Sequence, residues 1–382
     1  MKRKTRPLLR SSAVRLSGLR VRTAGLLLLT AAIFALAQGL EAQTQQNWEI
    51  GPFVRPEVGN PVITPQPSST FEDPIAGKAI HWEALHTFNP AAIVRKGKIY
   101  VLYRAEDDTG AMEIGGHTSR LGMAVSKDGI HFERMPAPVF YPAKDSQEAR
   151  EWPGGVEDPR IVESPGGMYV LTYTQWTRKT YSVGIAISKD LEHWTKYGPA
   201  FLEAAGGKYA ELKYKSAGIL TELDRKKHRL IAAQINGFYW MYWGEGAVHL
   251  ATSKDLIHWT PVDGQNGQPM EVLRPRPGHF DSMFPEVGPP PVLTEKGIVL
   301  MYNGKNADKD GDAKLGAGAY AAGEALFDPR NPMNFYTQAD EPVLWPELPY
   351  EKTGQYAAGT TFAEGLVWFK KKWFLYYGCA DS

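Results

Sequence analysis

Short runs of alternating apolar and polar residues fill the chain from about residue 86 onward, and many are followed by a turn and a second run rich in aromatic residues. Alternation with a period of two predicts half-buried β-strands, and a turn between two such runs predicts a hairpin. Five hairpins are predicted, from the segments Asn89–Ile93 with Tyr100–Glu106, Glu157–Ile161 with Tyr169–Thr174, Ser216–Leu220 with Tyr239–Trp243, Gly288–Val292 with Ile298–Asn303, and Ala363–Val367 with Trp373–Tyr377. No amphipathic helix pattern of normal length interrupts them.

A second pattern, built on the tripeptide Ser-Lys-Asp, recurs between these hairpins. Its three copies span residues 122–132, 184–194 and 249–259, so their starts lie 62 and 65 residues apart. Each copy predicts a short strand, a Ser-Lys-Asp turn and an aromatic residue packed behind the turn. Units repeated at such spacing are typical of radial architectures, and five hairpins predict five blades. We therefore expect one all-β catalytic domain over residues 43–382, a five-bladed β-propeller, in which Trp48–His86 adds an outer strand and the ring closure.

The first strand of each blade lines the axis of a propeller, so the turn residues of all five hairpins should meet at one end of the central channel. Ten polar side chains fall at or beside these hairpins: Asn89, Arg104, Glu106, Asp158, Arg160, Lys215, Glu245, Glu286, Asn303 and Asp381. For any one of them, a hydrogen bond within a turn or between blades is at least as good an explanation as function. The gathering of ten at one predicted position indicates a functional site.

The densest part of this set is Gly154–Arg160, which places two adjacent carboxylates and an arginine at a strand entrance. Its two glycines allow backbone conformations that other residues avoid. Proline restricts the residue before it, so Pro159 predicts an extended conformation for Asp158 and a side chain held in one direction. Taken alone, a charged turn before a hairpin is usually a solvated loop; its place in the repeat makes Asp158 our candidate for a catalytic acid.

Composition limits the class of ligand. The 43 Lys and Arg residues nearly balance the 42 Asp and Glu residues, and a net charge of +1 provides no basic field for nucleic acid. Aromatic residues make up 12% of the chain, and such rings suit both sheet packing and stacking against sugars. Cys379 is the only cysteine, so neither an internal disulfide nor a cysteine metal cluster is indicated. We expect a neutral substrate, with no cofactor and no metal; the oligomeric state stays open.

The first 42 residues have the features of an export signal. Eight Lys and Arg residues from Lys2 to Arg22 precede the apolar run Ala24–Ala37. Ala42 supplies the small residue of a cleavage site, and Ala35–Ala37 is a competing site. An apolar run of about 14 residues is short for a span of roughly 20, and an uncleaved membrane anchor is the alternative. We expect an exported protein, periplasmic or secreted, without stable membrane association after cleavage.

The motifs in this order resemble the five-bladed mannoside phosphorylases and mannosidases of glycoside hydrolase family 130, over nearly the whole chain after residue 42. The resemblance rests on Phe88–Ala92 with Tyr103–Glu106, Gly155–Arg160, the Ala-x-Ser-Lys-Asp repeats, Gly288–Val292 with Tyr302–Gly304, and Tyr376–Asp381. The Glu-Asp-Pro-Arg motif in that company is fairly specific, whereas the Ser-Lys-Asp repeats also occur in other sugar-cleaving propellers.

The resemblance implies that Asp158 is the general acid, which protonates the glycosidic oxygen directly or through a hydroxyl of the mannose in the −1 subsite. It also implies that Asn89, Arg104 and Asp381 hold that mannose, and charge-assisted hydrogen bonds to neighbouring hydroxyls suit the charged members of this set. Burial or the neighbouring Glu157 carboxylate would keep Asp158 protonated, whereas Arg160 would oppose this. The residues alone do not decide between these effects.

The family divides by nucleophile, and here the sequence departs from the usual phosphorylase pattern. In that pattern an inner strand after the third hairpin ends in a His-Arg pair for phosphate, whereas this chain reads Trp243-Gly244-Glu245. A carboxylate there repels phosphate and suits the deprotonation of water, and Glu286 in the next blade is a second candidate base. This pair resembles the family's hydrolases, which act on β-mannosides, β-1,2-linked ones among them. Inverting hydrolysis places acid and base about 6.5–9.5 Å apart across the scissile bond.

Three hypotheses follow. The first is an exported inverting β-mannosidase with the acid and the two candidate bases named above. The second is a β-mannoside phosphorylase that releases mannose 1-phosphate, because Lys213 and Lys215 lie near the place where the family phosphorylases use a lysine. The third is a non-catalytic carbohydrate-binding propeller.

Overall fold

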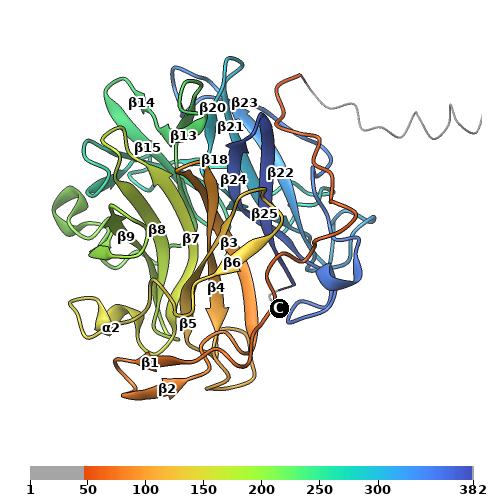
Figure 1. Ribbon diagram of the computed structural model, residues 1–382. Helices are drawn as coiled ribbons and strands as arrows, with labels where there is room; N and C mark the ends of the chain where they lie inside the picture. Colours follow the sequence, from red (N-terminus) through yellow and green to blue (C-terminus); the bar gives the residue numbers. More distant parts are fainter. Residues whose placement is uncertain (1–46, 381–382) are drawn as a thin grey trace, which may run out of the picture. The chain divides into compact units, whose positions relative to one another are not determined.

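The computed structural model describes residues 47–380 (Figure 1). The predicted export signal and Asp381 lie outside this range. Within it, strands dominate, and the helical elements are only α2 (Glu148–Glu151), η1 (Ala204–Gly207) and η2 (Pro349–Glu351). No helix in this range is long and apolar enough to span a membrane. The prediction of an all-β fold is confirmed.

All five predicted hairpins are present as antiparallel pairs. They are β3 (His86–Arg95) with β4 (Lys98–Glu106), β7 (Gly155–Glu163) with β8 (Tyr169–Trp176), β11 (Ala217–Ile219) with β15 (Phe238–Trp243), β19 (Phe284–Val287) and β20 (Val292–Leu293) with β21 (Ile298–Lys305), and β24 (Thr361–Phe369) with β25 (Lys372–Cys379). The sequence pattern located them correctly because each inner strand buries both faces and each turn carries Gly, Pro or charged residues.

Four of the hairpins continue into a third and a fourth antiparallel strand. These are β5 (Ser119–Ser126) and β6 (Phe132–Arg134), β9 (Tyr181–Ser188) and β10 (Trp194–Pro199), β16 (Val248–Ser253) and β17 (Trp259–Pro261), and β22 (Tyr320–Phe327) and β23 (Phe335–Gln338). The remaining strands are β1 (Phe71–Asp73), β2 (Lys78–Ile80), β12 (Thr221–Asp224), β13 (Arg229–Ala232), β14 (Gln234–Ile235) and β18 (Glu271–Leu273). Across residues 47–380, strand pairing yields four separate sheets and does not close into a ring.

The three Ser-Lys-Asp copies form the turns between third and fourth strands, as predicted. In each turn one oxygen of Asp128, Asp190 or Asp255 accepts hydrogen bonds from the backbone N–H groups two and three residues later. The other oxygen contacts the histidine three residues later. These repeats are therefore structural turns: Ser126, Ser188 and Ser253 are buried and accept backbone hydrogen bonds within them, whereas the histidines are exposed.

The hydrophobic core lies between neighbouring hairpins. Separate clusters of buried side chains join the first hairpin to the second, the second to the third, the third to the fourth, the fourth to the fifth and the fifth to the first. Figure 1 shows β24, β3 and β7 next to one another, and these inner strands are in contact. Burial on both faces of each inner strand follows from this arrangement.

The fifth hairpin differs from the other four because β25 pairs only with β24 within the described chain. Trp48–His86 does not add the expected outer strand: its own strands β1 and β2 pair with each other. The segment instead contacts the fourth and fifth hairpin units through hydrogen bonds to two carboxylate side chains. Arg55 Nε donates to Glu351 Oε1 at 2.6 Å, and the backbone N–H of Ile50 donates to Glu324 Oε2 at 3.0 Å.

A network of one tyrosine, one carboxylate and one cation recurs in the hairpin units. Tyr103 donates to Glu83 at 2.7 Å, and Arg134 of β6 contacts the same carboxylate. The second copy consists of Tyr173, Glu151 and Lys196, with Lys196 on β10. The copy in the fifth unit consists of Tyr377, Glu351 and Arg55. Arg55 thus supplies the cation that the fourth strand provides in the first two units.

Candidate active site

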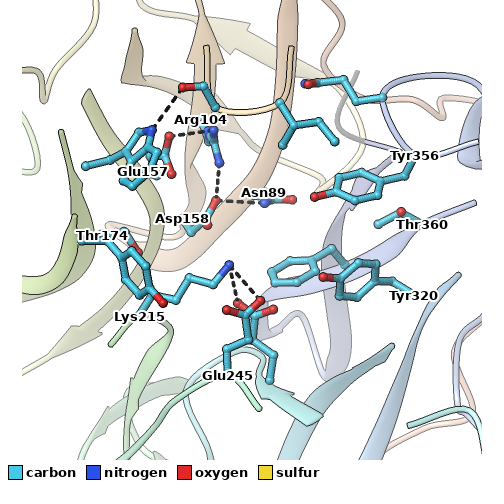
Figure 2. Close-up of a pocket in the computed structure, with 17 residues that line it drawn as sticks. Asn89, Arg104, Glu157, Asp158, Thr174, Lys215, Glu245, Tyr320, Tyr356 and Thr360 are labelled. Atoms are coloured by element: carbon cyan, nitrogen blue, oxygen red, sulfur yellow. Dashed lines mark hydrogen bonds and ion pairs between the residues drawn. The ribbon is translucent and has the colours of Figure 1, made fainter. Parts of the chain in front are cut away.

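Charged side chains from several hairpins meet in one cavity of about 240 Å³ (Figure 2). Six of the ten predicted site residues line it: Asn89, Arg104, Asp158, Lys215, Glu245 and Glu286. They come from β3, β4, β7, the segment before β11, the residues after β15, and β19. The predicted convergence of hairpin ends that lie far apart in the chain is therefore present for these six residues.

Two of the inner strands are irregular where they reach the cavity. The strand register shifts between Phe88 and Pro90 and between Glu157 and Arg160, so Asn89 and Asp158 each lie at a bulge. Both have a φ of 46°. The extended conformation predicted for Asp158 from Pro159 is therefore wrong. A left-handed conformation at a bulge redirects a side chain, and its cost of about 1–3 kcal/mol is tolerated mainly at functional sites.

Arg104 holds the side chains on one side of the cavity. Its Nη1 lies 3.1 Å from Asp158 Oδ1, and its Nη2 lies 2.7 Å from Glu157 Oε1. Its Nη2 is also 2.7 Å from Glu106 Oε1. Asn89 Nδ2 donates to Asp158 Oδ1 at 2.9 Å. Both carboxylates of the Glu-Asp-Pro-Arg motif are thus bound to the same guanidinium.

The pKa values of the two adjacent carboxyl groups, Glu157 and Asp158, are shifted in opposite directions. Burial raises the pKa of Glu157 to about 7, and the nearby carboxylates Asp158 and Glu106 add to this against the charge of Arg104. Burial also acts to raise the pKa of Asp158, but the charges of Arg104 and Lys215 outweigh it and lower that pKa. The sequence left open whether burial or the nearby cations would control the pKa of Asp158. In the structure the effect of the cations is larger, so the ionised form of Asp158 is favoured.

The opposite side of the cavity is organised by Lys215. Its Nζ lies 3.2 Å from Glu245 Oε1 and 3.5 Å from Glu286 Oε1. Ser216 donates to the same Glu286 oxygen. Burial raises the pKa of Glu286, whereas burial of Lys215 is outweighed by the carboxylates, whose charges raise the pKa of its ammonium group. Figure 2 shows Asp158 on one side of Lys215 and Glu245 on the other.

Aromatic residues that the sequence did not single out form the rest of the wall. Trp176 lies near the loop that follows β4, and its Nε1 donates to the Gly115 carbonyl at 3.2 Å. Tyr320 and Tyr356 face Arg104 and Lys215 across the cavity in Figure 2. Lys305 Nζ lies 4.9 Å from the Tyr320 ring centroid and 5.5 Å from that of Tyr356. Flat rings beside hydroxyl-binding carboxylates suit a sugar ligand.

Three predicted site residues do not line the cavity. Glu106 is fully buried behind Arg104. Arg160 donates to the backbone carbonyls of Val287 and Gly288 and pairs with Glu364. Asn303 exchanges two hydrogen bonds with the backbone of Ala363. Arg160 thus links the second hairpin to the fourth and fifth, and Asn303 links the fourth to the fifth. Direct substrate binding by these three side chains stays a prediction. Asp381 lies outside the described residues.

Of the two lysines considered for an anion, only Lys215 lines the cavity. Lys213 is exposed on the surface. Lys215 lies two residues before the third hairpin's inner strand β11. Ser216 stands between them, and its φ of 55° again marks an irregular strand end.

Comparison with known proteins relates the chain to enzymes that act on mannosides. A family model for glycoside hydrolase family 130, described as beta-1,4-mannooligosaccharide phosphorylase, matches residues 65–382. The "1,2-beta-oligomannan phosphorylase" of Thermoanaerobacter sp. (strain X514) is 32% identical over 305 residues, covering 79% of this chain and 88% of that protein.

Two solved structures are 52% identical to this chain and cover 88% of it. One, reported as "The GH130 family of mannoside phosphorylases contains glycoside hydrolases that target beta-1,2 mannosidic linkages in Candida mannan", has a TM-score of 0.86 and is covered over 93% of its length. The other, a glycosyl hydrolase from Bacteroides ovatus, has a TM-score of 0.85 and is covered over 92%.

Proposed function

Because the chain belongs to glycoside hydrolase family 130, we propose that it hydrolyses β-mannosides, β-1,2-linked ones among them, with inversion at the anomeric carbon. Support for hydrolysis comes from the high identity to a structure whose reported subject is glycoside hydrolases of this family. Support for the linkage comes from the same structure and from the oligomannan phosphorylase named above.

The charge balance of the cavity is the observation that carries this proposal. Among the described residues that line it, Arg104 and Lys215 are the cations, and four are carboxylates. Arg104 contacts Glu157 and Asp158, and Lys215 contacts two more. A dianionic phosphate would have to displace carboxylates from both cations, and like charges at such distances repel. A neutral water molecule has no such penalty.

In the proposed reaction, Asp158 supplies the proton that the leaving glycosidic oxygen needs, directly or through a hydroxyl of the −1 mannose. Glu245 or Glu286 removes a proton from the attacking water on the other side of the sugar. Asn89 and Arg104 hold the mannose, together with Asp381 from outside the described range. The positive charge of Lys215 opposes protonation of Glu286, whose pKa is raised by burial.

Product analysis tests this function. Purified protein is incubated with β-1,2-mannobiose, with and without inorganic phosphate, and the anomer released is followed by NMR. We expect α-mannose to appear first, at equal rates in both samples. Turnover only with phosphate, giving mannose 1-phosphate, would contradict the proposal.

A phosphorylase is the second candidate, and Lys215 is the specific observation that favours it. Its ammonium group lies in the cavity, and the relative from Thermoanaerobacter is named as a phosphorylase. Both of its carboxylate contacts would have to rearrange before phosphate could bind there.

We also propose that the five hairpins form one five-bladed β-propeller. The cyclic order of the core clusters supports this, since each hairpin shares a core with the next and the fifth with the first. An experimental structure in which the inner strands do not surround a common axis would contradict it.

For residues 1–42 we propose cleavage and export. Mass spectrometry of the mature protein from its native host should place the new N-terminus at Gln43, and cell fractionation should find the protein outside the cytoplasm. An intact N-terminus in the cytoplasmic fraction would contradict this.

A further inference from the structure

Glu157 and Asp158 are adjacent in sequence, and a regular strand would not place both of their side chains in the cavity. Successive residues of a regular strand point to opposite faces, so only one of the two should reach the site. The bulge between Glu157 and Arg160 breaks this alternation. As a result both carboxyl groups line the cavity and both contact Arg104, through Nη2 and Nη1 respectively.

We propose that Glu157 and Asp158 act as one acid that shares a single proton, and that Glu157 holds this proton in the free enzyme at neutral pH. This rests on the proposed function only in that Asp158 protonates the leaving oxygen. Glu157 acts through Asp158 and is therefore a positioning residue for the proton.

The proton path is balanced at each step. As the O–H bond of Glu157 breaks, a water molecule in the cavity takes its proton and passes one of its own to Asp158, where an O–H bond forms and the negative charge is neutralised. Asp158 then passes the proton to the leaving oxygen while the C1–O bond breaks and its electron pair goes to that oxygen. Glu157, now a carboxylate facing Arg104, regains a proton from solvent before the next cycle.

The groups around Glu157 support this assignment. Glu157 accepts hydrogen bonds from Arg104 of β4 and from Ser119 of β5. Ser119 also contacts Glu106 of β4, and Asp158 follows Glu157 on β7. Asp158 is faced by more cations, since Arg160 of β7 and Lys215 add to Arg104.

The remaining buried carboxylate near Asp158, Glu364 of β24, is paired with Arg160. Two close carboxylates that share one guanidinium cannot both ionise freely, so they titrate as a pair. Burial raises the pKa of Glu157 to about 7, whereas that of Asp158 is lowered.

Two substitutions should move the alkaline limb of kcat/KM in opposite directions. Glu157→Gln removes the group that holds the proton in the free enzyme, so only Asp158, whose pKa is lowered, can carry it. Since burial raises the pKa of Glu157 to about 7, we expect the wild-type limb near pH 7. In Glu157→Gln it should lie at least one unit lower, with a loss of tenfold or more at pH 7 that is partly regained at acid pH. Ser119→Ala removes a hydrogen bond that favours ionised Glu157, so its limb should move higher.

Ser216→Ala is the matched control, because Ser216 is equally buried and donates to Glu286 across the cavity. It should move the acid limb and leave the alkaline limb in place. An alkaline limb unmoved by Glu157→Gln, a loss equal at every pH, or a wild-type profile with no limb near pH 7 would overturn the proposal. If Glu157→Gln does not fold, Ser119→Ala tests the proposal alone, and an alkaline limb that does not move to higher pH would overturn it. Should the wild type require phosphate, the same profiles are measured with phosphate, since the leaving oxygen needs the proton in either reaction.

Discussion

At the residue scale, the site depends on four carboxyl groups that contact two cations. Asp158 accepts hydrogen bonds from Asn89 and Arg104, and the same Arg104 reaches Glu157. Lys215 has the corresponding position opposite, between Glu245 and Glu286. Replacing one of these charged side chains by a neutral one of similar size should therefore show what its charge contributes to activity.

Asp158→Asn keeps the size of the side chain and removes the acidic proton. We expect kcat on β-1,2-mannobiose to fall by about 10²–10⁴-fold, the usual contribution of a general acid. Affinity for mannose, measured by calorimetry, should change little. Asp340→Asn, at a side chain that is 80% exposed, is the control and should retain wild-type kcat. Equal kcat in both variants would remove Asp158 from the reaction.

Lys215→Met tests whether the charge of Lys215 lowers the pKa of the candidate base Glu286. The charge of Lys215 lowers the pKa of Glu286 against the effect of burial, so its removal should raise that pKa. A base that must be ionised then becomes active only at higher pH, and the acid limb of the kcat profile should shift upward. A limb that stays in place would show that Lys215 does not govern the base.

Azide distinguishes Glu245 from Glu286. Removal of a general base by substitution with alanine leaves a space that a small anion can enter, and azide needs no deprotonation. We expect azide to restore turnover, with α-mannosyl azide as product, in the alanine variant of whichever glutamate is the base. Rescue of neither variant would contradict both assignments.

At the element scale, each hairpin combines a regular β-sheet with an irregular inner end. The regular part packs tyrosines of the second strand against glycines of the third. A Cβ on Gly184 would lie 2.5 Å from Cζ of Tyr173, whose hydroxyl donates to Glu151. The irregular ends, at Asn89 and Asp158, supply the site.

Gly184→Ala should destabilise the second hairpin unit through overpacking. The expected loss in free energy of unfolding is about 1–3 kcal/mol, measured by urea denaturation. Gly166→Ala is the control, since its Cβ would meet only Ser164 Oγ at 3.9 Å. Equal stability of the two variants would show that Tyr173 can move without cost.

The sequence was sufficient for the hairpins and for six site residues, because alternation and turn residues are local signals. It could not predict which side of an irregular strand a side chain takes. Arg160 and Asn303, predicted at the ligand, bond to other hairpins and do not line the cavity. Tyr320 and Tyr356 carry no short motif, and only the folded arrangement brings them to the cavity.

At the scale of the whole molecule, the fifth hairpin depends on residues from the other end of the described chain. Arg55 donates to Glu351 through Nε and to the Trp345 carbonyl through Nη2, and it pairs with Glu347. Glu351 is fully buried, so removal of its cation would leave a buried charge unpaired.

Arg55→Met should therefore lower the free energy of unfolding by about 3 kcal/mol, the low end for breaking a buried ion pair. The midpoint of urea denaturation measures this. Arg225→Met removes a pair with Glu295 in which both side chains are largely exposed, and it should change stability by less than about 1 kcal/mol. Similar midpoints for the two variants would show that Arg55 does not stabilise the fifth hairpin.

The pairing of Arg55 with Glu351 also bears on how the protein is made. The two residues are 296 positions apart, so Arg55 is synthesised long before its partner exists. Until β24 and β25 emerge, the apolar side of the first hairpin lacks Val367, Phe369 and Tyr376, which complete its cover beside Ile80 and Trp82. A nascent chain in this state exposes hydrophobic surface and is prone to aggregate. We therefore expect the growing polypeptide to need a holding chaperone until its last hairpin has been translated.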